Sequence, residues 1–137
     1  MENEIALIYR KKLVNRHSIE GVFKPLENLS IINKIEIPCD FNSVKSVLET
    51  IRFAFKIKQK NIHITGDVHY LAIFFFWKKI IITVHDSYYY ESAKGIKKIL
   101  YGLIWFRIPL KIANRITVVS PETKKNLIKH FNISENK

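Results

Sequence analysis

Short runs of β-branched and aliphatic residues alternate along this chain with longer stretches in which apolar residues recur at helical spacing. The short runs predict strands at residues 4–10, 34–38, 61–65, 80–85 and 115–119. The longer stretches predict helices at residues 18–29, 43–56, 68–77, 94–112 and 121–130. Strands that alternate with helices are typical of a parallel sheet with helices on both faces. We therefore expect an α/β fold, a Rossmann-like three-layer domain with a mainly parallel sheet of about five strands.

The apolar stripe of each helix predicts which side faces the core. The helix that begins at Asn42 or Ser43 has the clearest stripe, and the helix at residues 18–29 has a shorter one with Pro25 inside it. The first stripe consists of Val44, Val47, Leu48, Ile51, Ala54 and Phe55, and the second of Ile19, Val22, Phe23 and Leu26.

Several single residues predict where helices begin, break or are absent. Ser120, Pro121 and Glu122 form a strong helix start, because serine caps, proline fits the first position and an acid suits the first turn. Asp67 is placed to cap the helix that follows it. Pro109 is expected to disturb the long helix, because proline lacks an N–H. Residues 88–90, three consecutive tyrosines, are expected in a loop.

Ligands of parallel sheets bind beyond the carboxyl ends of the strands, so the residues there are the candidate site. Gly66 and Asp67 follow the third predicted strand, and either they let a ligand approach the backbone or they form a plain turn with a cap. His85 ends an apolar strand and precedes Asp86. A histidine at this position is suited to substrate contact or acid–base chemistry, or alternatively to a structural hydrogen bond with a loop. His69 lies near the neighbouring strand end.

The other histidines favour structural roles. His63 lies inside a strand between two isoleucines and is expected to pack, and His130 closes the last helix. No two of the five histidines have metal-ligand spacing on a helix, so we expect no metal site. The chain also has no Gly-x-Gly-x-x-Gly motif, no P-loop and no Gly-x-Ser-x-Gly motif, which argues against those nucleotide sites and against the hydrolase elbow.

Length and charge add a partner to this picture. The chain has 137 residues, enough for one domain, and Cys39 alone excludes a disulfide framework. The net charge is +11. Residues 1–68 contribute +3, from 11 basic and 8 acidic residues, and residues 69–137 contribute +8, from 12 and 4. Such a surplus attracts an anionic membrane, a phosphorylated ligand or a nucleic acid. No apolar run approaches the ~20 residues that a membrane span needs.

Basic and aromatic residues mix along the long helix, as they do on helices that lie at a membrane interface. The residues expected to face a membrane are Lys94, Lys97, Lys98, Trp105, Arg107 and Lys111. A charged face in contact with solvent alone is the alternative. Only 5 of the 23 basic residues are Arg, which makes nucleic acid an unlikely partner.

The order of several segments resembles a known family. NIHITGDVHYLA is followed by IIITVHDS, then by a long basic helix and by ANRITVVSPETKKNL, and the early HSIEGVF is similar to a Ser-Ile-Glu-x-x-Phe element. Together these segments resemble the N-terminal domain of family 4 glycosyltransferases of the GT-B fold. The basic loop at residues 11–17 departs from the family pattern, in which a Gly-rich loop is usual.

The resemblance implies a function for the candidate residues. Such enzymes bind a sugar acceptor in the N-terminal domain and a nucleotide-sugar donor in a second domain, and they transfer the sugar with retention of configuration and without a metal or other cofactor in the protein. His85 would reach the transferred sugar, whereas Gly66, Asp67, His69 and Asp86 would shape the acceptor pocket. Many members bind membranes and act on lipid-linked acceptors.

We therefore interpret residues 1–137 as a single acceptor domain that stops before the family's next strand and before the donor domain. No Glu-x₇-Glu donor motif occurs. The chain would be cytoplasmic and peripheral to the inner face of a membrane, inactive in isolation, and completed by a donor domain that could be a separate subunit. The rival interpretation is a non-catalytic basic α/β module that binds anionic membrane or nucleic acid.

Overall fold

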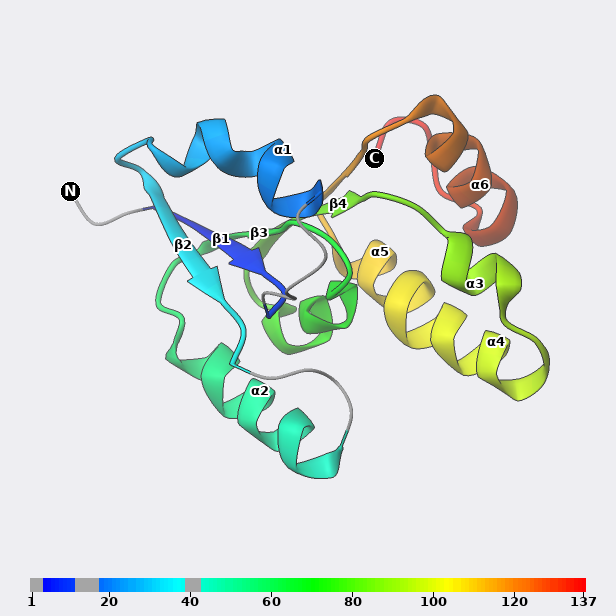
Figure 1. The fold of residues 1–137 in the computed structure, drawn as a ribbon, viewed down its shortest axis with the longest axis horizontal. Helices are drawn as coiled ribbons and strands as arrows, with labels where there is room; N and C mark the ends of the chain where they lie inside the picture. Colours follow the sequence, from blue (N-terminus) through cyan, green and yellow to red (C-terminus); the bar gives the residue numbers. More distant parts are fainter. Residues whose placement is uncertain (1–3, 12–17, 39–42) are drawn as a thin grey trace.

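The computed structural model describes residues 4–11, 18–38 and 43–137, and within them a parallel sheet forms the centre of the molecule (Figure 1). Its five strands lie in the order β2-β1-β3-β4-β5, and every neighbouring pair is parallel. The strands are β1 (Ile5–Tyr9), β2 (Ile32–Glu36), β3 (Asn61–Ile64), β4 (Lys79–Val84) and β5 (Arg115–Val118). The predicted α/β, Rossmann-like architecture is confirmed.

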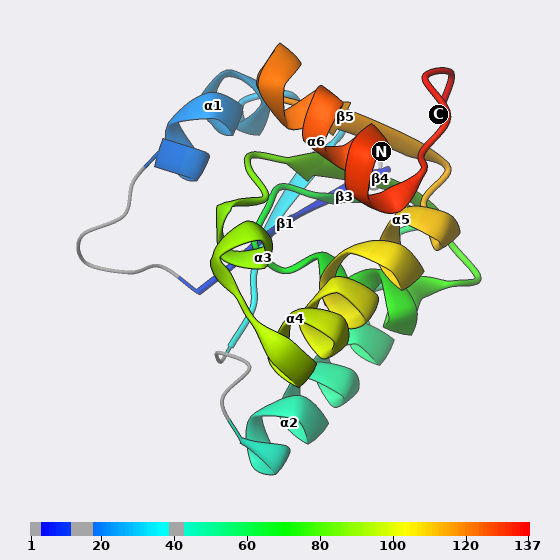
Figure 2. The same cartoon turned by 90° about the vertical axis from the view of Figure 1, so that its right-hand side faces the viewer.

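Helices cover both faces of the sheet (Figure 2). One layer contains α2 (Val44–Lys56), the 3₁₀ helix η1 (His69–Phe75), α4 (Gly95–Tyr101), the π-helical turn η2 (Gly102–Arg107) and α5 (Ile108–Ile112). The same layer ends with α6 (Pro121–Phe131), which lies beside β5 and packs Leu127 into the larger core, whereas the other face carries α1 (Ser18–Glu27). The short helix α3 (Tyr88–Ser92) follows β4.

Alternate residues of β1 supply the cores on the two faces. Ala6 and Ile8 belong to the larger core, whereas Leu7 and Tyr9 pack with Ile19 of α1 in a smaller one. Successive side chains of a strand point to opposite faces, so a strand that is covered on both sides is apolar throughout. The unbroken apolar run that predicted such a strand at residues 80–85 has the same cause.

The apolar stripe predicted for the core-facing side of α2 is largely wrong. Val44 is 79% exposed and Phe55 is 66% exposed, and Leu48 is exposed as well. Ala54 of the predicted stripe is buried, and the other buried residues of α2 are the small residues Ser46 and Thr50, which the stripe did not include. The same error occurs on α1, where Ile19 and Phe23 are buried but Val22 and Leu26 are exposed. Small inward residues let α2 approach η1 closely, and the larger residues of the stripe are left on the surface.

The long helix predicted at residues 94–112 is interrupted earlier than expected. Its middle forms η2, in which the N–H of Ile108 donates to the Leu103 carbonyl five residues before it. Pro109 follows, and it has no N–H to donate and a ring that clashes with the carbonyl four residues earlier. The wider π turn, which is frequent at functional sites, accommodates the proline without breaking the helix direction.

Other local predictions had mixed outcomes. Ser120 caps α6 by accepting from the Thr123 N–H at 3.1 Å, and Ser43 caps α2 through a capping box. His63 packs against Phe23 and contacts the Thr83 hydroxyl at 2.8 Å. β2 begins two residues before the predicted strand, and residues 88–90 lie in α3 rather than in a loop. Among the described residues, no helix is long and apolar enough to cross a membrane.

Candidate functional site

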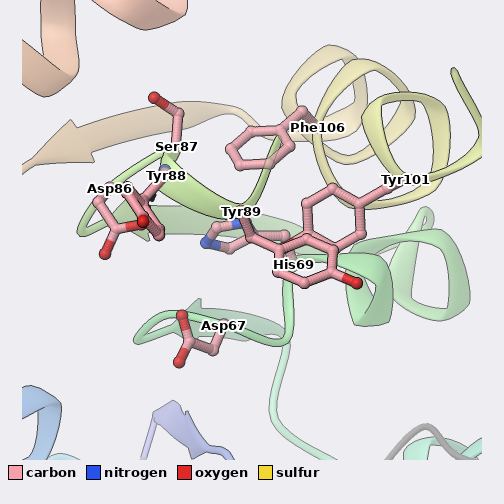
Figure 3. A pocket seen from close by; sticks show the side chains of 8 residues that line it. All are labelled: Asp67, His69, Asp86, Ser87, Tyr88, Tyr89, Tyr101 and Phe106. Carbon is pink, nitrogen blue, oxygen red and sulfur yellow. Dashed lines mark hydrogen bonds between the residues drawn. The ribbon is translucent and has the colours of Figure 1, made fainter. Parts of the chain in front are cut away.

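A cavity of about 530 Å³ opens beyond the carboxyl ends of β3 and β4 (Figure 3). In this view Asp67 and Asp86 lie to the left of the rings of Tyr89, Tyr101 and Phe106, and Tyr88 lies beside Asp86. The lining residues are Asp67, His69, Asp86, Ser87, Tyr88, Tyr89, Tyr101 and Phe106. Three of the residues predicted to shape an acceptor pocket, Asp67, His69 and Asp86, therefore line one cavity.

Asp67 is held in place by contacts on both its side chain and its backbone. Its φ is +54°, and its Oδ2 accepts from Arg10 Nη1 at 2.7 Å. Its carbonyl accepts from the Trp105 indole N–H at 3.0 Å. Val68, not Asp67, is the residue before η1, and no side chain caps that helix, so the predicted cap is wrong. The ion pair with Arg10 and the hydrogen bond from Trp105 instead hold Asp67 in the lining of the cavity.

Arg10 is buried at the end of β1 and lies between two carboxylates. Its Nη1 contacts Asp67, and its Nε lies 3.7 Å from Glu20 Oε1 of α1. Burying a guanidinium requires such partners, because an unpaired charge away from water is very costly. The pair therefore ties β1, α1 and the loop after β3 together directly behind the cavity.

His69 is a buried, neutral histidine in the cavity wall. It is 3% exposed, and burial lowers its pKa to about 4, an effect that Asp67 opposes. Nε2 lies 3.3 Å from the Thr83 carbonyl oxygen, which can only accept, so Nε2 is the protonated nitrogen. Nδ1 is shielded from solvent, and the Trp105 backbone favours the protonated ring. His69 therefore forms part of the wall through its ring and not through an accessible nitrogen.

Aromatic stacking fixes another part of the cavity wall. Tyr101 stacks on Trp105 with ring centroids 5.0 Å apart, and Tyr89 tilts against it at 4.7 Å. Phe106 stacks on Phe131 of α6 at 4.8 Å. Burial, followed by the negative charges of Asp67 and Asp86, raises the pKa of Tyr101, so its phenol keeps its proton at neutral pH.

Asp86 and Ser87 are oriented by the start of α3. Asp86 Oδ1 accepts from the Tyr88 N–H at 3.1 Å, and Asp86 is one of the residues that line the cavity. Ser87 is buried, and its hydroxyl donates to Glu91 Oε1, which also accepts from Asn126 at 2.9 Å. The turn after β4 is therefore rigidly held by both α3 and α6.

His85 and Gly66 lie beside this cavity but do not line it. His85 Nε2 donates to the Thr65 carbonyl at 2.8 Å, and the ring packs edge-on to Phe23. A Cβ on Gly66, whose φ is +145°, would lie 2.6 Å from the His85 ring, so the glycine leaves room for that ring. The structural hydrogen bond that sequence reasoning offered as the alternative for His85 is present, and its role in substrate contact stays a prediction.

The six residues predicted to face a membrane do not share one environment. Lys94, Lys97, Arg107 and Lys111 are exposed. Lys98 is half-buried, with its amine 4.9 Å from the Tyr90 ring centroid, and Trp105 is half-buried in the cavity wall. The exposed apolar residues of this region are others, namely Ile96, Ile99, Leu100 and Leu103.

Sequence reasoning missed Arg10, Tyr101 and Phe106. Arg10 directly follows a strand, so the rule that points to strand ends would have found it. The two aromatic residues lie in the middle of a predicted helix, and no local pattern distinguishes them from core residues. Within the described ranges, no group of three or more His, Cys, Asp or Glu side chains is arranged to hold a metal ion.

A parallel α/β sheet with a cavity at the carboxyl ends of its strands is the arrangement of Rossmann-like ligand-binding domains. Residues 17–137 match the family model described as Glycosyltransferase Family 4, which represents the N-terminal domain of enzymes with the GT-B fold. The chain belongs to this glycosyltransferase family. No curated protein and no solved structure matches it.

Proposed function

We propose that residues 1–137 form the acceptor domain of a retaining glycosyltransferase, which moves a sugar from a nucleotide-sugar to a lipid-linked or glycan acceptor. The observation that carries this proposal is the cavity where Asp67, His69 and Asp86 meet, at the edge where parallel sheets bind ligands. The nucleotide-sugar enters through a donor domain, either on the same polypeptide or on a separate subunit, and no cofactor takes part.

In this proposal the carboxylates of Asp67 and Asp86 accept hydrogen bonds from the acceptor's hydroxyl groups, and Gly66 shapes the turn that presents them. His85 contacts the transferred sugar. Because Nε2 donates to the Thr65 carbonyl, Nδ1 is the ring nitrogen that contacts a sugar hydroxyl in this proposal. A contact that strengthens as charge develops on the sugar lowers the activation barrier. A contact that is equally strong in the ground state and the transition state does not.

Transferase assays with and without a donor domain test this proposal. The purified chain alone should transfer no sugar, and detectable transfer by it would overturn the need for a donor domain. In a version with a family donor domain, His85→Ala should lower the rate by about 10²–10³. His130→Gln, in the last turn of α6, is the matched control and should keep the parental rate.

The same assay separates catalysis from folding at His85. If His85→Ala melts well below the parent, or turns over within a few-fold of it, the hydrogen bond to Thr65 is the main role of this residue. Because the ring also packs on Phe23 and Gly66, thermal melting must be measured beside the rate. A normal melting temperature with a large rate loss supports the catalytic role.

We also propose that the outer surface of the α2–α4 layer docks on an anionic membrane. Ile96 of α4 is 72% exposed, and Phe55 of α2 stacks on exposed Trp77 with centroids 5.4 Å apart. Exposed basic residues accompany both helices, namely Lys45, Arg52, Lys56, Lys94, Lys97, Arg107 and Lys111. Helices with outward apolar residues between basic ones are suited to the boundary between lipid headgroups and acyl chains.

Co-sedimentation with vesicles tests this docking. Binding to anionic phosphatidylglycerol vesicles should weaken with salt, because each basic residue near the surface contributes about 1 kcal/mol. Ile96→Ser and Phe55→Ser should each reduce binding, whereas Val119→Ser, an exposed apolar residue at the end of β5, should not. Equal binding to neutral vesicles, or tighter binding to single-stranded DNA, contradicts the proposal.

A further inference from the structure

The polar atoms available in the cavity wall are mainly hydrogen-bond acceptors. Asp67 has Oδ1 left after its pair with Arg10, and Asp86 has Oδ2 left after the Tyr88 N–H. His69 contributes its ring surface to the wall but no accessible acceptor, because Nε2 is bonded to the Thr83 carbonyl and Nδ1 is buried. The tyrosine hydroxyls can donate or accept, so they do not discriminate. A ligand that fits the two carboxylate oxygens must bring donors.

The charge of the cavity differs in sign from the charge of the whole chain. Among the described residues, the charged side chains that line it are both carboxylates, and no Lys or Arg lines it. Arg10 lies behind Asp67, where it is shared with Glu20. Lys98 is directed to the Tyr90 ring, outside the lining. Both carboxylates are exposed, so water screens them in part, and their effect is greatest on a charge within a few ångströms.

Tyr101 and Tyr89 pack together and provide an aromatic wall of the cavity. Trp105 supports the Tyr101 ring from one side, and the Trp105 indole N–H is bonded to the Asp67 carbonyl. The aromatic platform and the acidic loop are therefore held in one fixed relation by a single side chain. Figure 3 shows Tyr89 and Tyr101 to the right of Asp67 and Asp86. A ring with one apolar face and hydroxyls around its rim complements this arrangement.

We propose that the cavity selects an acceptor sugar that is uncharged or carries an amine, and that it rejects sugars with a carboxylate or phosphate on the ring that enters. The ring lies against the aromatic wall that Tyr89 and Tyr101 form, and its hydroxyl or ammonium groups donate to Asp67 and Asp86. This selectivity rests on the proposed acceptor role of the cavity. Any phosphate of a lipid-linked acceptor then lies outside the cavity, toward the basic surface of the α4 region.

Titration of the chain with three matched glycosides, followed by two-dimensional NMR of the backbone amides, tests the selectivity. The probes are methyl β-glucoside, methyl β-glucosaminide and methyl β-glucuronide, which differ in charge and little in shape. The neutral and amine probes should shift the amides of residues around Asp67, Asp86 and Tyr101. The glucuronide should bind roughly ten-fold more weakly or worse, as expected for a like charge at a few ångströms.

Substitutions at Asp86 and Tyr101 test which side chains cause the preference for the neutral and amine probes. Asp86→Asn removes one negative charge at an exposed side chain. The affinity for the glucoside should then exceed that for the glucuronide by no more than about three-fold. Glu135→Gln, an exposed carboxylate on the C-terminal segment, is the matched control and should leave the preference unchanged. Tyr101→Leu should weaken all neutral binding, whereas Tyr101→Phe should preserve most of it, because stacking needs the ring and not the hydroxyl.

The outcomes distinguish a failure of the selectivity from a failure of the proposed acceptor role. If the glucuronide binds as tightly as the glucoside, the selectivity is overturned while the acceptor role stands. If the preference is unchanged in Asp86→Asn, the carboxylate is not its cause and the proposal also fails. If no glycoside shifts the amides of the cavity, both the selectivity and the proposed acceptor role are overturned.

Discussion

Acid should destabilise this domain through His69, whose ring is buried in the cavity wall. Burial lowers its pKa from 6.5 to about 4. A group with a lower pKa in the folded state takes up its proton more readily when the chain unfolds. The stability that depends on the neutral ring is therefore complete above the unfolded pKa, and it is lost as the pH falls from that value toward the folded pKa.

The size of the effect follows from proton linkage. With folded and unfolded pKa values of about 4 and 6.5, lowering the pH from about 7.5 to about 5 removes ~2 kcal/mol of unfolding free energy through His69 alone. Burial also lowers the pKa of His63 to about 4, so that residue adds a loss of the same sign over the same range. The total free energy of unfolding of a domain is typically about 5–15 kcal/mol, so a change of this size is easily measured.

Urea unfolding followed by circular dichroism at the two pH values provides the test. His69→Asn removes the titrating ring and keeps a polar side chain beside the Thr83 carbonyl. The variant should be less stable at the higher pH, yet it should lose ~2 kcal/mol less than the parent when the pH is lowered. His63 and all carboxylates are present in both proteins, so the difference isolates His69. An equal loss in both proteins would refute a buried, neutral His69.

Two further substitutions test local features of the fold. Gly66→Ala should lower the free energy of unfolding by about 2–4 kcal/mol, because the new Cβ would clash with the His85 ring and the backbone φ is positive. In the same thermal melts the control Gly21→Ala should be neutral or stabilising, because nothing lies within 4 Å of its new Cβ. Ser120→Ala should cost about 1 kcal/mol in urea unfolding by removing the cap of α6, and a loss no greater than that of the exposed Ser30→Ala would show that the cap contributes nothing.

Part of the candidate site could be predicted from sequence because parallel sheets present their strand ends at one edge. That rule found Asp67, His69 and Asp86, and the cavity contains all three. It did not distinguish residues that face the cavity from those beside it, such as His85, whose ring is turned toward the Thr65 carbonyl. The direction of a side chain after a strand depends on the packing of neighbouring helices, which the local sequence does not record.

The sequence by itself determined the alternation of strands and helices, the parallel sheet and the serine cap of α6. These features depend on residues within a few positions of one another, so periodicity and capping chemistry are sufficient to predict them. Tertiary structure decided which face of α2 is buried, because the small residues Ser46, Thr50 and Ala54 allow a closer approach to η1 than its large apolar stripe would. It also brought Tyr101 and Trp105 to the loop that contains Asp67. Contacts between residues more than thirty positions apart arise only when the sheet and its helices pack together, and for that reason the cavity was visible only in the folded chain.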